Sequence, residues 1–362
     1  MKRVLIVNSK FTYGKINYGG VNKMLLWLGN SLHKEGYSVE FCTLYDTERA
    51  DKIDNGIPSY EYGITYYSSY WKRNFYFLKD SYACLKRHFK THQYDYVVSF
   101  DGLAFFPLLA LRNKYKYQFV VSERSDPNNN HSAIAVLHRR LYKYVDLLVC
   151  QTEGAKNCFS KKIQEKSVVI PNSIEIPAEQ WTSDINTCAI ACVGRLDIWQ
   201  KRQDVLLKAF KAVHEIHTDY ILNIYGSGPD EDKLKALTEE LGITDSVVFN
   251  GAVSNVNSLL LNNELYVISS DFEGIPNTLL EAMALGMPVV ATKCSPGGAE
   301  FLIDNSENGV LVDCDNPAQL AEAINYIIEN RGKAANMGCN ARASVNRFVP
   351  SKIIQLWKSV FK

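Results

Sequence analysis

Short apolar runs alternate with helical patterns along nearly the whole chain, which predicts an α/β fold with parallel sheets. In the first half, the runs that we interpret as strands are Val4–Asn8, Val39–Leu44, Tyr96–Phe100, Phe119–Ser122, Leu147–Gln151 and Val168–Ile170. In the second half, they are Cys188–Val193, Ile221–Tyr225, Val247–Phe249, Leu265–Ser269, Pro288–Ala291 and Val310–Val312. Helical patterns separate them, among them Val21–Lys34, Leu103–Leu111, Asp204–Ile216, Asp230–Leu241 and Asn277–Leu285.

This alternation of strands and helices occurs once in each half of the chain. Because 362 residues are also too many for one ordinary core, we expect two domains. Pro171, Pro177 and polar residues interrupt the periodicity between them. We place one Rossmann-like domain over residues 1–172 and a second one over residues 173–348. A helix within residues 349–362 should pack back on the first domain. Ligands of such sheets bind outside the carboxyl ends of the strands, so two sheets can share one cleft.

The composition, with 46% hydrophobic and 22% charged residues, is typical of a globular protein. No apolar run approaches the roughly 18–20 residues of a membrane-spanning helix, and Val4–Val7 is too short for a signal peptide. The nine cysteines are scattered, without a CxxC pair or a cluster at zinc spacing. We therefore expect reduced thiols in a cytoplasmic protein.

The net charge of +1 conceals a difference between the two halves. Residues 1–170 contain 25 Lys and Arg against 15 Asp and Glu, a charge of +10, and residues 171–362 contain 15 against 24, a charge of −9. The basic half suits an anionic partner such as inner-leaflet lipid, a polyprenyl pyrophosphate or nucleic acid, or it is an ordinary solvated surface. Because no nucleic-acid reader motif is recognisable, we expect no nucleic-acid partner.

Residues 71–90 combine aromatic and basic side chains in a helical pattern. Such a helix suits an anionic membrane surface, with its rings at the headgroup boundary and its cations toward the lipid. That interpretation predicts peripheral association with the inner face of the cytoplasmic membrane. Alternatively, Phe75, Leu78, Tyr82 and Leu85 form a core face and the cations a solvated one.

The strongest chemical signal is the segment Ser269–Ala284. It follows a predicted strand, turns at Gly274 and Pro276, and opens a helix at Asn277 or Thr278. The free N–H groups at the start of that helix can hold a phosphate.

Two carboxylates flank this helix start, Glu273 in the turn and Glu281 eight positions later. A ligand with both hydroxyl groups and phosphate would suit them, and a nucleoside diphosphate sugar is such a ligand. The alternative is a surface turn residue and a charge on a helix face.

The pattern E-G-x-x-x-x-x-x-E from Glu273 to Glu281 resembles the paired-glutamate motif of retaining GT-B glycosyltransferases of family 4, also called glycosyl transferases group 1. Further segments that resemble this family are Val193–Leu196 with Lys201-Arg202, Tyr225–Pro229, Phe249–Val253, Gly286–Thr292 and Gly297–Glu300. In the first half, Tyr18–Val21 resembles the glycine pair before the first helix. The resemblance implies two Rossmann-like domains that face a central cleft, the first (residues 1–172) binding the acceptor and the second (residues 173–348) binding the nucleotide sugar.

The resemblance also implies roles for the matching residues. Arg195 and Lys201 would contact the donor's diphosphate, where charge develops in the transition state, and Glu273 would hold hydroxyls of the transferred sugar. These three are the expected catalytic residues. Glu281 would hold the ribose, and the backbone at Val253 the base. The other donor-binding residues that the resemblance implies are Gly19, Gly20, Gly226, Ile275, Pro276, Asn277, Thr278 and Leu279.

The segment Ser122–Pro127 departs from the family, because Arg124 stands where many relatives have a histidine. Its S-E-R-x-D-P form resembles a subgroup associated with surface polysaccharide and lipid-linked oligosaccharide assembly. Arg124 would contact the donor or an acceptor pyrophosphate, and Glu123 an acceptor hydroxyl. Alternatively, either of them belongs to a structural ion pair at the edge of the cleft.

We expect no metal and no cofactor besides the nucleotide sugar. The acids Asp313 and Asp315 have the D-x-D spacing that metal-dependent glycosyltransferases of another fold use, but they precede the helix-opening pair Asn316-Pro317. Capping and turn formation explain them better.

The sequence thus predicts a retaining hexosyl- or N-acetylhexosaminyltransferase. It would use a nucleoside diphosphate sugar, UDP-linked by preference, and a glycan or polyprenyl-pyrophosphate-linked acceptor. Two alternatives are a GT-B enzyme of other chemistry, such as a nucleotide-sugar epimerase or a phosphorylase, and a non-catalytic nucleotide-sugar-binding module. The joint presence of Arg195, Lys201, Glu273 and Glu281 favours the transferase.

Overall fold

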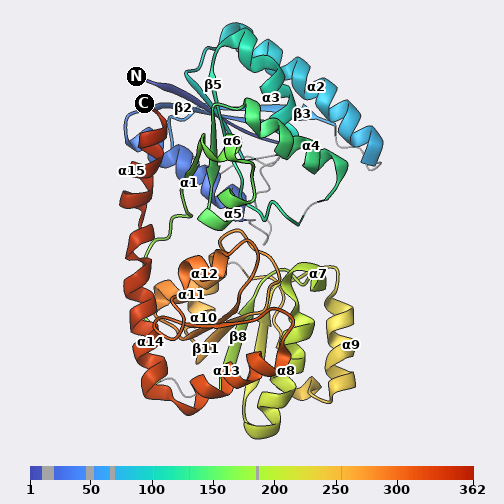
Figure 1. Ribbon diagram of the computed structural model, residues 1–362, viewed down its shortest axis with the longest axis vertical. Helices are drawn as coiled ribbons and strands as arrows, with labels where there is room; N and C mark the ends of the chain where they lie inside the picture. The colour runs from blue at the N-terminus through green and yellow to red at the C-terminus, as the bar shows by residue number, and fades with distance from the viewer. Residues whose placement is uncertain are drawn as a thin grey trace. The chain divides into compact units, whose positions relative to one another are not determined.

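Two parallel sheets with helices packed against them make up the computed structural model (Figure 1). The structure describes residues 1–9, 20–45, 53–65, 70–100, 102–129, 131–184, 187–253 and 255–362, and the side chains of residues 70–74 lie outside this description. The chain divides into two compact units: unit 1 is Met1–Pro171 with Ser351–Lys362, and unit 2 is Asn172–Pro350.

The described part of unit 1 has a seven-stranded sheet in the order β3-β2-β1-β4-β5-β6-β7, in which every neighbouring pair is parallel. Its strands are β1 (Arg3–Asn8), β2 (Ser38–Tyr45), β3 (Ser59–Ile64), β4 (Tyr96–Ser99), β5 (Gln118–Ser122), β6 (Leu147–Cys150) and β7 (Ser167–Val169). Its helices are α1 (Gly20–Lys34), α2 (Tyr70–Thr91), α3 (Gly102–Tyr115), α4 (Ala133–Leu141), the 3-10 helix η1 (Tyr142–Tyr144), α5 (Glu153–Asn157), α6 (Lys161–Gln164) and α15 (Pro350–Val360).

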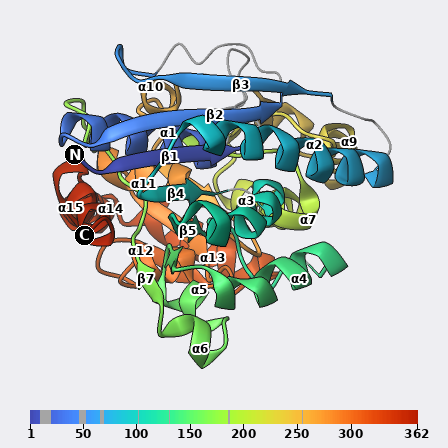
Figure 2. The same cartoon turned by 90° about the horizontal axis from the view of Figure 1, so that it is seen from above.

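Helices cover both faces of this sheet, whose strands lie side by side in Figure 2. Neighbouring residues of a strand point to opposite faces. In β2, Cys42 packs in one cluster with Phe77 of α2 and Phe105 of α3. Its neighbour Phe41 points to α1, where a Cβ added to Gly29 would lie 2.1 Å from the Phe41 ring. Burial on both faces explains why the central strands are continuous apolar runs.

Unit 2 repeats this architecture with a six-stranded parallel sheet in the order β10-β9-β8-β11-β12-β13, counted over its described residues. Its strands are β8 (Ala189–Val193), β9 (Ile221–Tyr225), β10 (Val247–Phe249), β11 (Leu265–Ile268), β12 (Val289–Thr292) and β13 (Val310–Val312). Its helices are α7 (Ile198–Lys201), α8 (Gln203–Ile216), α9 (Glu231–Leu241), α10 (Val256–Leu260), α11 (Asn277–Leu285), α12 (Gly298–Leu302), α13 (Pro317–Glu329) and α14 (Arg331–Ser344), with the 3-10 helices η2 (Thr244–Ser246) and η3 (Val345–Phe348).

The prediction of two doubly wound parallel sheets is confirmed, and every predicted strand is present within one residue at each end. Strand β3 was not predicted from the sequence. This strand lies at the edge of its sheet, pairs with β2, and exposes alternate residues, so it has no continuous apolar run.

Of the four residues of α2 that the sequence offered as a core face, Leu85 is buried in the core of unit 1 and Leu78 packs against it, whereas the other two are exposed. The buried residues of α2 are Phe77, Ser81, Leu85, His88 and Phe89. Phe75 is 66% exposed and Tyr82 38% exposed, so the expectation that these two belong to a core face is wrong. Residues i, i+4 and i+8 from Phe77 form the buried stripe instead, because that spacing keeps them on one side of a helix.

Helix α15 returns to unit 1 after the chain has traversed unit 2. Its Trp357 is fully buried and stacks on Phe100, with 5.9 Å between the ring centroids. Phe361 packs edge-on against Tyr96 at 5.0 Å, and Lys358 Nζ lies 2.5 Å from Glu35 Oε2. In the part of the chain that the structure describes, no helix has the length and apolarity needed to cross a membrane.

We expect Trp357→Ala to lower the free energy of unfolding by about 3–5 kcal/mol, because it leaves a cavity where a large, fully buried ring had packed. Leu356→Ala is the matched control on the same helix, since Leu356 is 42% exposed, and it should cost less than about 1 kcal/mol. Urea denaturation of the two variants measures both values. Equal losses would show that α15 is not anchored by Trp357.

Candidate active site

The predicted donor-binding residues of unit 2 follow the carboxyl ends of its parallel strands. Arg195 follows β8, Gly226 follows β9, Val253 follows β10, and Glu273 follows β11. Since parallel strands end at one edge of a sheet, these loops are neighbours although they are up to 78 residues apart in sequence. This edge is where open α/β sheets bind their ligands.

The loops along this edge approach each other through backbone atoms. Gly226 has a φ of 145°, and a Cβ added to it would lie 1.8 Å from the carbonyl oxygen of Gly194. Its N–H donates to the carbonyl of Gly251 at 2.7 Å. A Cβ on Gly298 would lie 1.7 Å from the carbonyl oxygen of Gly274. Only glycine permits these approaches.

Lys201 and Glu273 form an ion pair at this edge, so two of the three predicted catalytic residues lie together. The side chain of Lys201 is 18% exposed and that of Glu273 is 11% exposed. Ser270 Oγ donates to Glu273 Oε1 at 2.8 Å, and Gln200 Nε2 lies 3.4 Å from Oε2. Both carboxylate oxygens are therefore held in place.

Arg202 fixes the turn that carries Lys201. It has a φ of 47°, between α7 and α8, and its guanidinium donates to three carboxylates, those of Asp204, Asp271 and Asp315, at 3.2, 2.7 and 2.6 Å. Burial alone would lower the pKa of Arg202, but these hydrogen bonds outweigh it and raise that pKa above its ordinary value. The turn is thus joined to the loops after β11 and β13.

Arg195 is held less tightly. Its side chain is 65% exposed, and Nη1 lies 3.7 Å from Asp197 Oδ2. Its carbonyl, by contrast, accepts from Gln203 Nε2 at 2.7 Å. The backbone is therefore placed while the guanidinium extends toward solvent, where it can meet a ligand.

The start of α11 lies beside Glu273 in the chain, and Pro276 is its N-cap residue. Asn277 accepts from Asn172 Nδ2 at 2.6 Å, and Thr278 Oγ1 lies 2.6 Å from the hydroxyl of Tyr266. Leu279 is fully buried, so only its backbone N–H can face a ligand.

The remaining predicted donor residues have varied surroundings. Ile275 is 5% exposed, and Glu281, in the second turn of α11, is partly buried. Val253 is partly exposed after β10, and Gly20 begins α1 in unit 1. Gly19 lies outside the described residues.

In unit 1, Glu123 follows β5 at the carboxyl edge of the sheet and is held by its neighbours. Tyr142 donates to Glu123 Oε2 at 2.9 Å, and Ser125 Oγ donates to Oε1 at 2.7 Å. His138 Nδ1 lies 3.4 Å from the Tyr142 hydroxyl. Burial lowers the pKa of His138 to about 4, with Arg139 adding to the effect, so its imidazole is neutral at pH 7.

Arg124 lies among aromatic rings. Its guanidinium carbon is 4.7 Å from the centroid of Phe100 and 5.8 Å from that of Trp357, and Nη1 donates to the carbonyl of Ile170 at 3.5 Å. Burial lowers the pKa of Arg124 to about 9, so the group remains charged at pH 7. The guanidinium thus packs against Trp357 of α15. The contact of Arg124 with a donor or acceptor stays a prediction.

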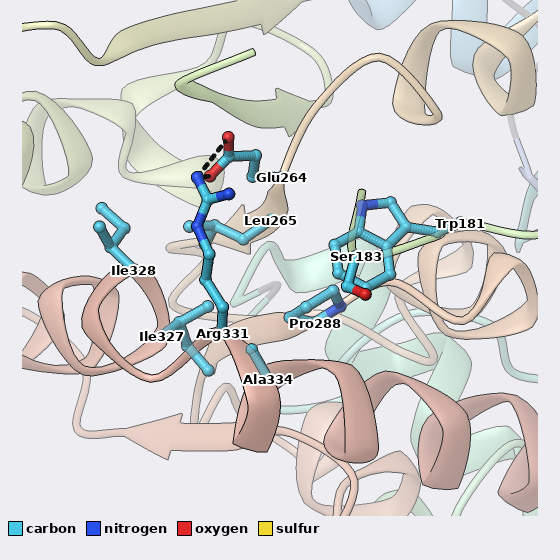
Figure 3. A pocket seen from close by; sticks show the side chains of 9 residues that line it. All are labelled: Trp181, Ser183, Glu264, Leu265, Pro288, Ile327, Ile328, Arg331 and Ala334. Atoms are coloured by element: carbon cyan, nitrogen blue, oxygen red, sulfur yellow. Dashed lines mark hydrogen bonds and ion pairs between the residues drawn. The ribbon is translucent and has the colours of Figure 1, made fainter. Parts of the chain in front are cut away.

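A pocket at the opposite edge of the unit 2 sheet has a structural explanation. Trp181, Pro288 and Arg331 line it, and Arg331 pairs with Glu264 at 3.0 Å (Figure 3). Its volume is about 20 Å³, enough for about one water molecule. It is too small for a nucleotide, and it lies at the amino end of β11, away from Glu273.

Asp313 and Asp315, the pair with D-x-D spacing, bind cationic side chains. Asp313 Oδ1 accepts from Lys293 Nζ at 2.7 Å, and Asp315 accepts from Arg202. Among the described residues there is no group of three or more His, Cys, Asp or Glu side chains that could hold a metal ion. Metal independence itself stays a prediction.

Several residues that hold the predicted site residues in place were not predicted from the sequence. Gln200 and Ser270 hold the carboxylate of Glu273, and Tyr142 holds that of Glu123. Gln200 directly precedes Lys201, and Ser270 lies within the segment Ser269–Ala284. Proximity in sequence to a predicted site residue was therefore the available signal for both. Tyr142 had no such signal, because it lies 19 positions from Glu123.

Comparisons with known proteins give one consistent result. The family described as "Glycosyltransferase Family 4" matches residues 18–176, and the one described as "Glycosyl transferases group 1" matches residues 176–344. The chain is 28% identical to an uncharacterized glycosyltransferase of Haemophilus influenzae, over 94% of this chain and 96% of that protein.

Two further relatives add detail. A Campylobacter jejuni protein is 24% identical over 96% of each chain, and it is named as an α-1,4-N-acetyl-D-galactosaminyltransferase acting on a glycan attached to PP-undecaprenol. Among solved structures, Staphylococcus aureus TarM in complex with UDP, fondaparinux and α-GlcNAc-glycerol superimposes with a TM-score of 0.83 at 15% identity, covering 100% of both chains. That similarity bears on the fold.

Proposed function

Because the chain belongs to the group 1 glycosyltransferases of family 4, which have the GT-B fold, we propose that it is a retaining, UDP-sugar-dependent transferase of surface-glycan assembly. The transferred sugar is a hexose or an N-acetylhexosamine, and the acceptor is a glycan or lipid-linked oligosaccharide. The observation that carries the proposal is the Lys201–Glu273 pair at the carboxyl edge of the unit 2 sheet. The Campylobacter relative's lipid-linked acceptor and the UDP bound to TarM support the choice of substrates.

In this proposal the diphosphate lies at the carboxyl edge of unit 2. Arg195 and Lys201 neutralise the charge that develops on it as the bond from the anomeric carbon to the diphosphate oxygen breaks. The N–H groups at the start of α11, at Asn277, Thr278 and Leu279, face the same anion. A new bond forms from the acceptor oxygen to the anomeric carbon on the same face, and the acceptor's hydroxyl proton leaves with the departing phosphate.

The two glutamates bind the sugars of the donor. Glu273 accepts hydrogen bonds from hydroxyls of the transferred sugar, and its contacts with Ser270 and Gln200 fix its orientation before the donor arrives. Glu281 holds the ribose hydroxyls, and the backbone near Val253 pairs with the base. Glu123, fixed by Tyr142, positions an acceptor hydroxyl.

We expect Arg195→Ala and Lys201→Ala each to lower kcat/KM by about 100-fold or more, because each removes a charge that stabilises the leaving diphosphate. Steady-state kinetics with UDP-sugar donors measure this effect. Lys208→Ala is the matched control, since Lys208 is an exposed cation on α8, and it should retain wild-type kinetics. Unchanged kinetics in a folded Arg195→Ala variant would remove Arg195 from the site.

We also expect activity to survive EDTA. The carboxylates with metal-like spacing, Asp313 and Asp315, already bind Lys293 and Arg202, and Arg195 and Lys201 supply the positive charge that a metal would otherwise provide. Turnover should therefore be the same within about twofold before and after chelation. A strict requirement for Mn²⁺ or Mg²⁺ would contradict the proposal.

Peripheral membrane docking through α2 extends the proposed function to a lipid-linked acceptor. The exposed side of this helix carries Phe75, Tyr82, Lys79, Arg87 and Lys90, so rings and cations share one surface. Trp71, Lys72 and Arg73 of the same predicted surface have side chains outside the described residues. Rings at the headgroup level and cations toward anionic lipid would bind such a surface.

Co-sedimentation with phosphatidylglycerol vesicles tests this docking. Each Lys or Arg contributes about 1 kcal/mol near an anionic surface, so Arg87→Glu with Lys90→Glu should weaken binding by about 30-fold or more. High salt should have a similar effect. The double variant Lys208→Glu with Lys333→Glu, in unit 2, makes the same change in charge and should bind normally. If the wild-type protein stays in the supernatant at low salt, α2 does not dock on membranes.

A further inference from the structure

A groove of about 720 Å³ lies in unit 1 between α4 and the segment that contains α5 and α6. The loop after β5 forms one end of it through Pro127 and Asn128. Every residue that lines it belongs to unit 1, and none of these described lining residues is Asp or Glu.

Cationic side chains line this groove from both sides. Arg139, Arg140 and Lys143 come from α4 and η1, and Lys162 comes from α6. Arg140, Lys143 and Lys162 are exposed. His131, just before the N-cap residue of α4, also lines the groove. The carboxylate of Asp126 acts on Cys158 in the lining, but the cations outnumber it and create a positive potential that attracts an anion.

The helix dipole explains only part of this charge. Arg139 and Arg140 are in the last turn of α4, where cations interact favourably with the helix terminus. Lys162 belongs to another helix across the groove, and Lys143 lies beyond the end of α4. The dipole of α4 therefore does not account for Lys143 and Lys162.

Apolar side chains form the floor of the same groove. Phe159 is 7% exposed and Ile163 5% exposed, and Val136 of α4 faces them across the groove. Helix α4 itself has no buried residue, and its Leu137 is 50% exposed. Such a surface suits a ligand with an anionic head and an apolar chain.

The groove is connected to the acceptor side of the proposed site. Glu123 and Pro127 belong to one loop, four residues apart, and Pro127 lines the groove. Tyr142, which directly follows α4, donates to Glu123. The groove therefore adjoins the segment that carries Glu123, and the sugars of a lipid-linked acceptor can span the distance between them.

We infer that this groove binds the diphosphate and the first isoprenoid units of a polyprenyl-diphosphate-linked acceptor. The cations of α4, η1 and α6 hold the diphosphate, and Phe159 and Ile163 contact the chain. The inference rests on the proposed function for the identity of the acceptor, but the groove's chemistry can be tested without turnover. The groove is specific to the isoprenoid diphosphate, whereas α2 is the proposed surface for bulk anionic lipid.

Farnesyl diphosphate, a short isoprenoid diphosphate, is the probe, and isothermal titration calorimetry of the full chain measures its affinity. We expect the triple variant Arg140→Glu, Lys143→Glu and Lys162→Glu to lose about 100-fold or more, since hydrogen bonds to a charged group are stronger than neutral ones. Inorganic pyrophosphate should bind more weakly than the probe, and farnesol weaker still. UDP affinity of the triple variant, measured in parallel, should equal that of the wild type and so report a folded protein.

The α2 variant Arg87→Glu with Lys90→Glu is the control, and it should bind farnesyl diphosphate within about twofold of wild type while losing vesicle binding. Equal losses of the probe in both variants, or an unaffected triple variant, would overturn the inference. Farnesol binding as tightly as the diphosphate would also overturn it. If the probe binds as expected but no UDP-sugar is turned over, the groove stands and the proposed function falls. If UDP-sugars are turned over but farnesyl diphosphate does not bind, the proposed function stands and the inference about the groove is wrong.

Discussion

The candidate active site depends on the direct backbone contact between the loops at the carboxyl edge of the unit 2 sheet. Gly226 meets the carbonyl of Gly194, and Gly298 meets that of Gly274, at distances that leave no room for a Cβ. Because no side chain intervenes, the backbones of loops from different strands fix each other's positions. Glu273 follows β11 on one of these loops, and its N–H donates to the carbonyl of Ser295 at 2.8 Å. Preorganisation of this kind precedes any ligand.

The Lys201–Glu273 pair is the main charged feature that these loops carry. Neither side chain is more than 18% exposed, so each charge loses hydration and depends on its partner. Arg202 stabilises the arrangement from behind through three carboxylates, two of them on other loops of the same edge. In the proposed complex, the diphosphate would bind Lys201 and the sugar hydroxyls would bind Glu273, since the phosphate needs a cation and the hydroxyls need an acceptor. The same contacts therefore hold the two side chains in place and leave each of them a ligand group to bind in the proposed complex.

Strands and helices that follow from a local repeat of apolar residues could be predicted from the sequence. Contacts between residues far apart in the chain could not. The strands of both sheets were predicted because burial on two faces requires continuous apolar runs. The edge strand β3 lacks such a run, and Phe75 and Tyr82 satisfy a helical spacing that belongs to the exposed side of α2. The pairing of Lys201 with Glu273 joins residues 72 positions apart. Motif resemblance suggested both residues, but only the parallel topology places them in contact.

Unit 1 was less predictable than unit 2 for a physical reason. In unit 2, glycines and a helix start define the site, and these leave local traces in sequence. In unit 1, the surroundings of the site are built by side chains from separate elements. Arg124 packs against Trp357, which lies more than 200 positions later, and the cationic groove combines α4 with α6. Side chains from separate elements can be exchanged, and a ligand thereby changed, without disturbing the sheet beneath them.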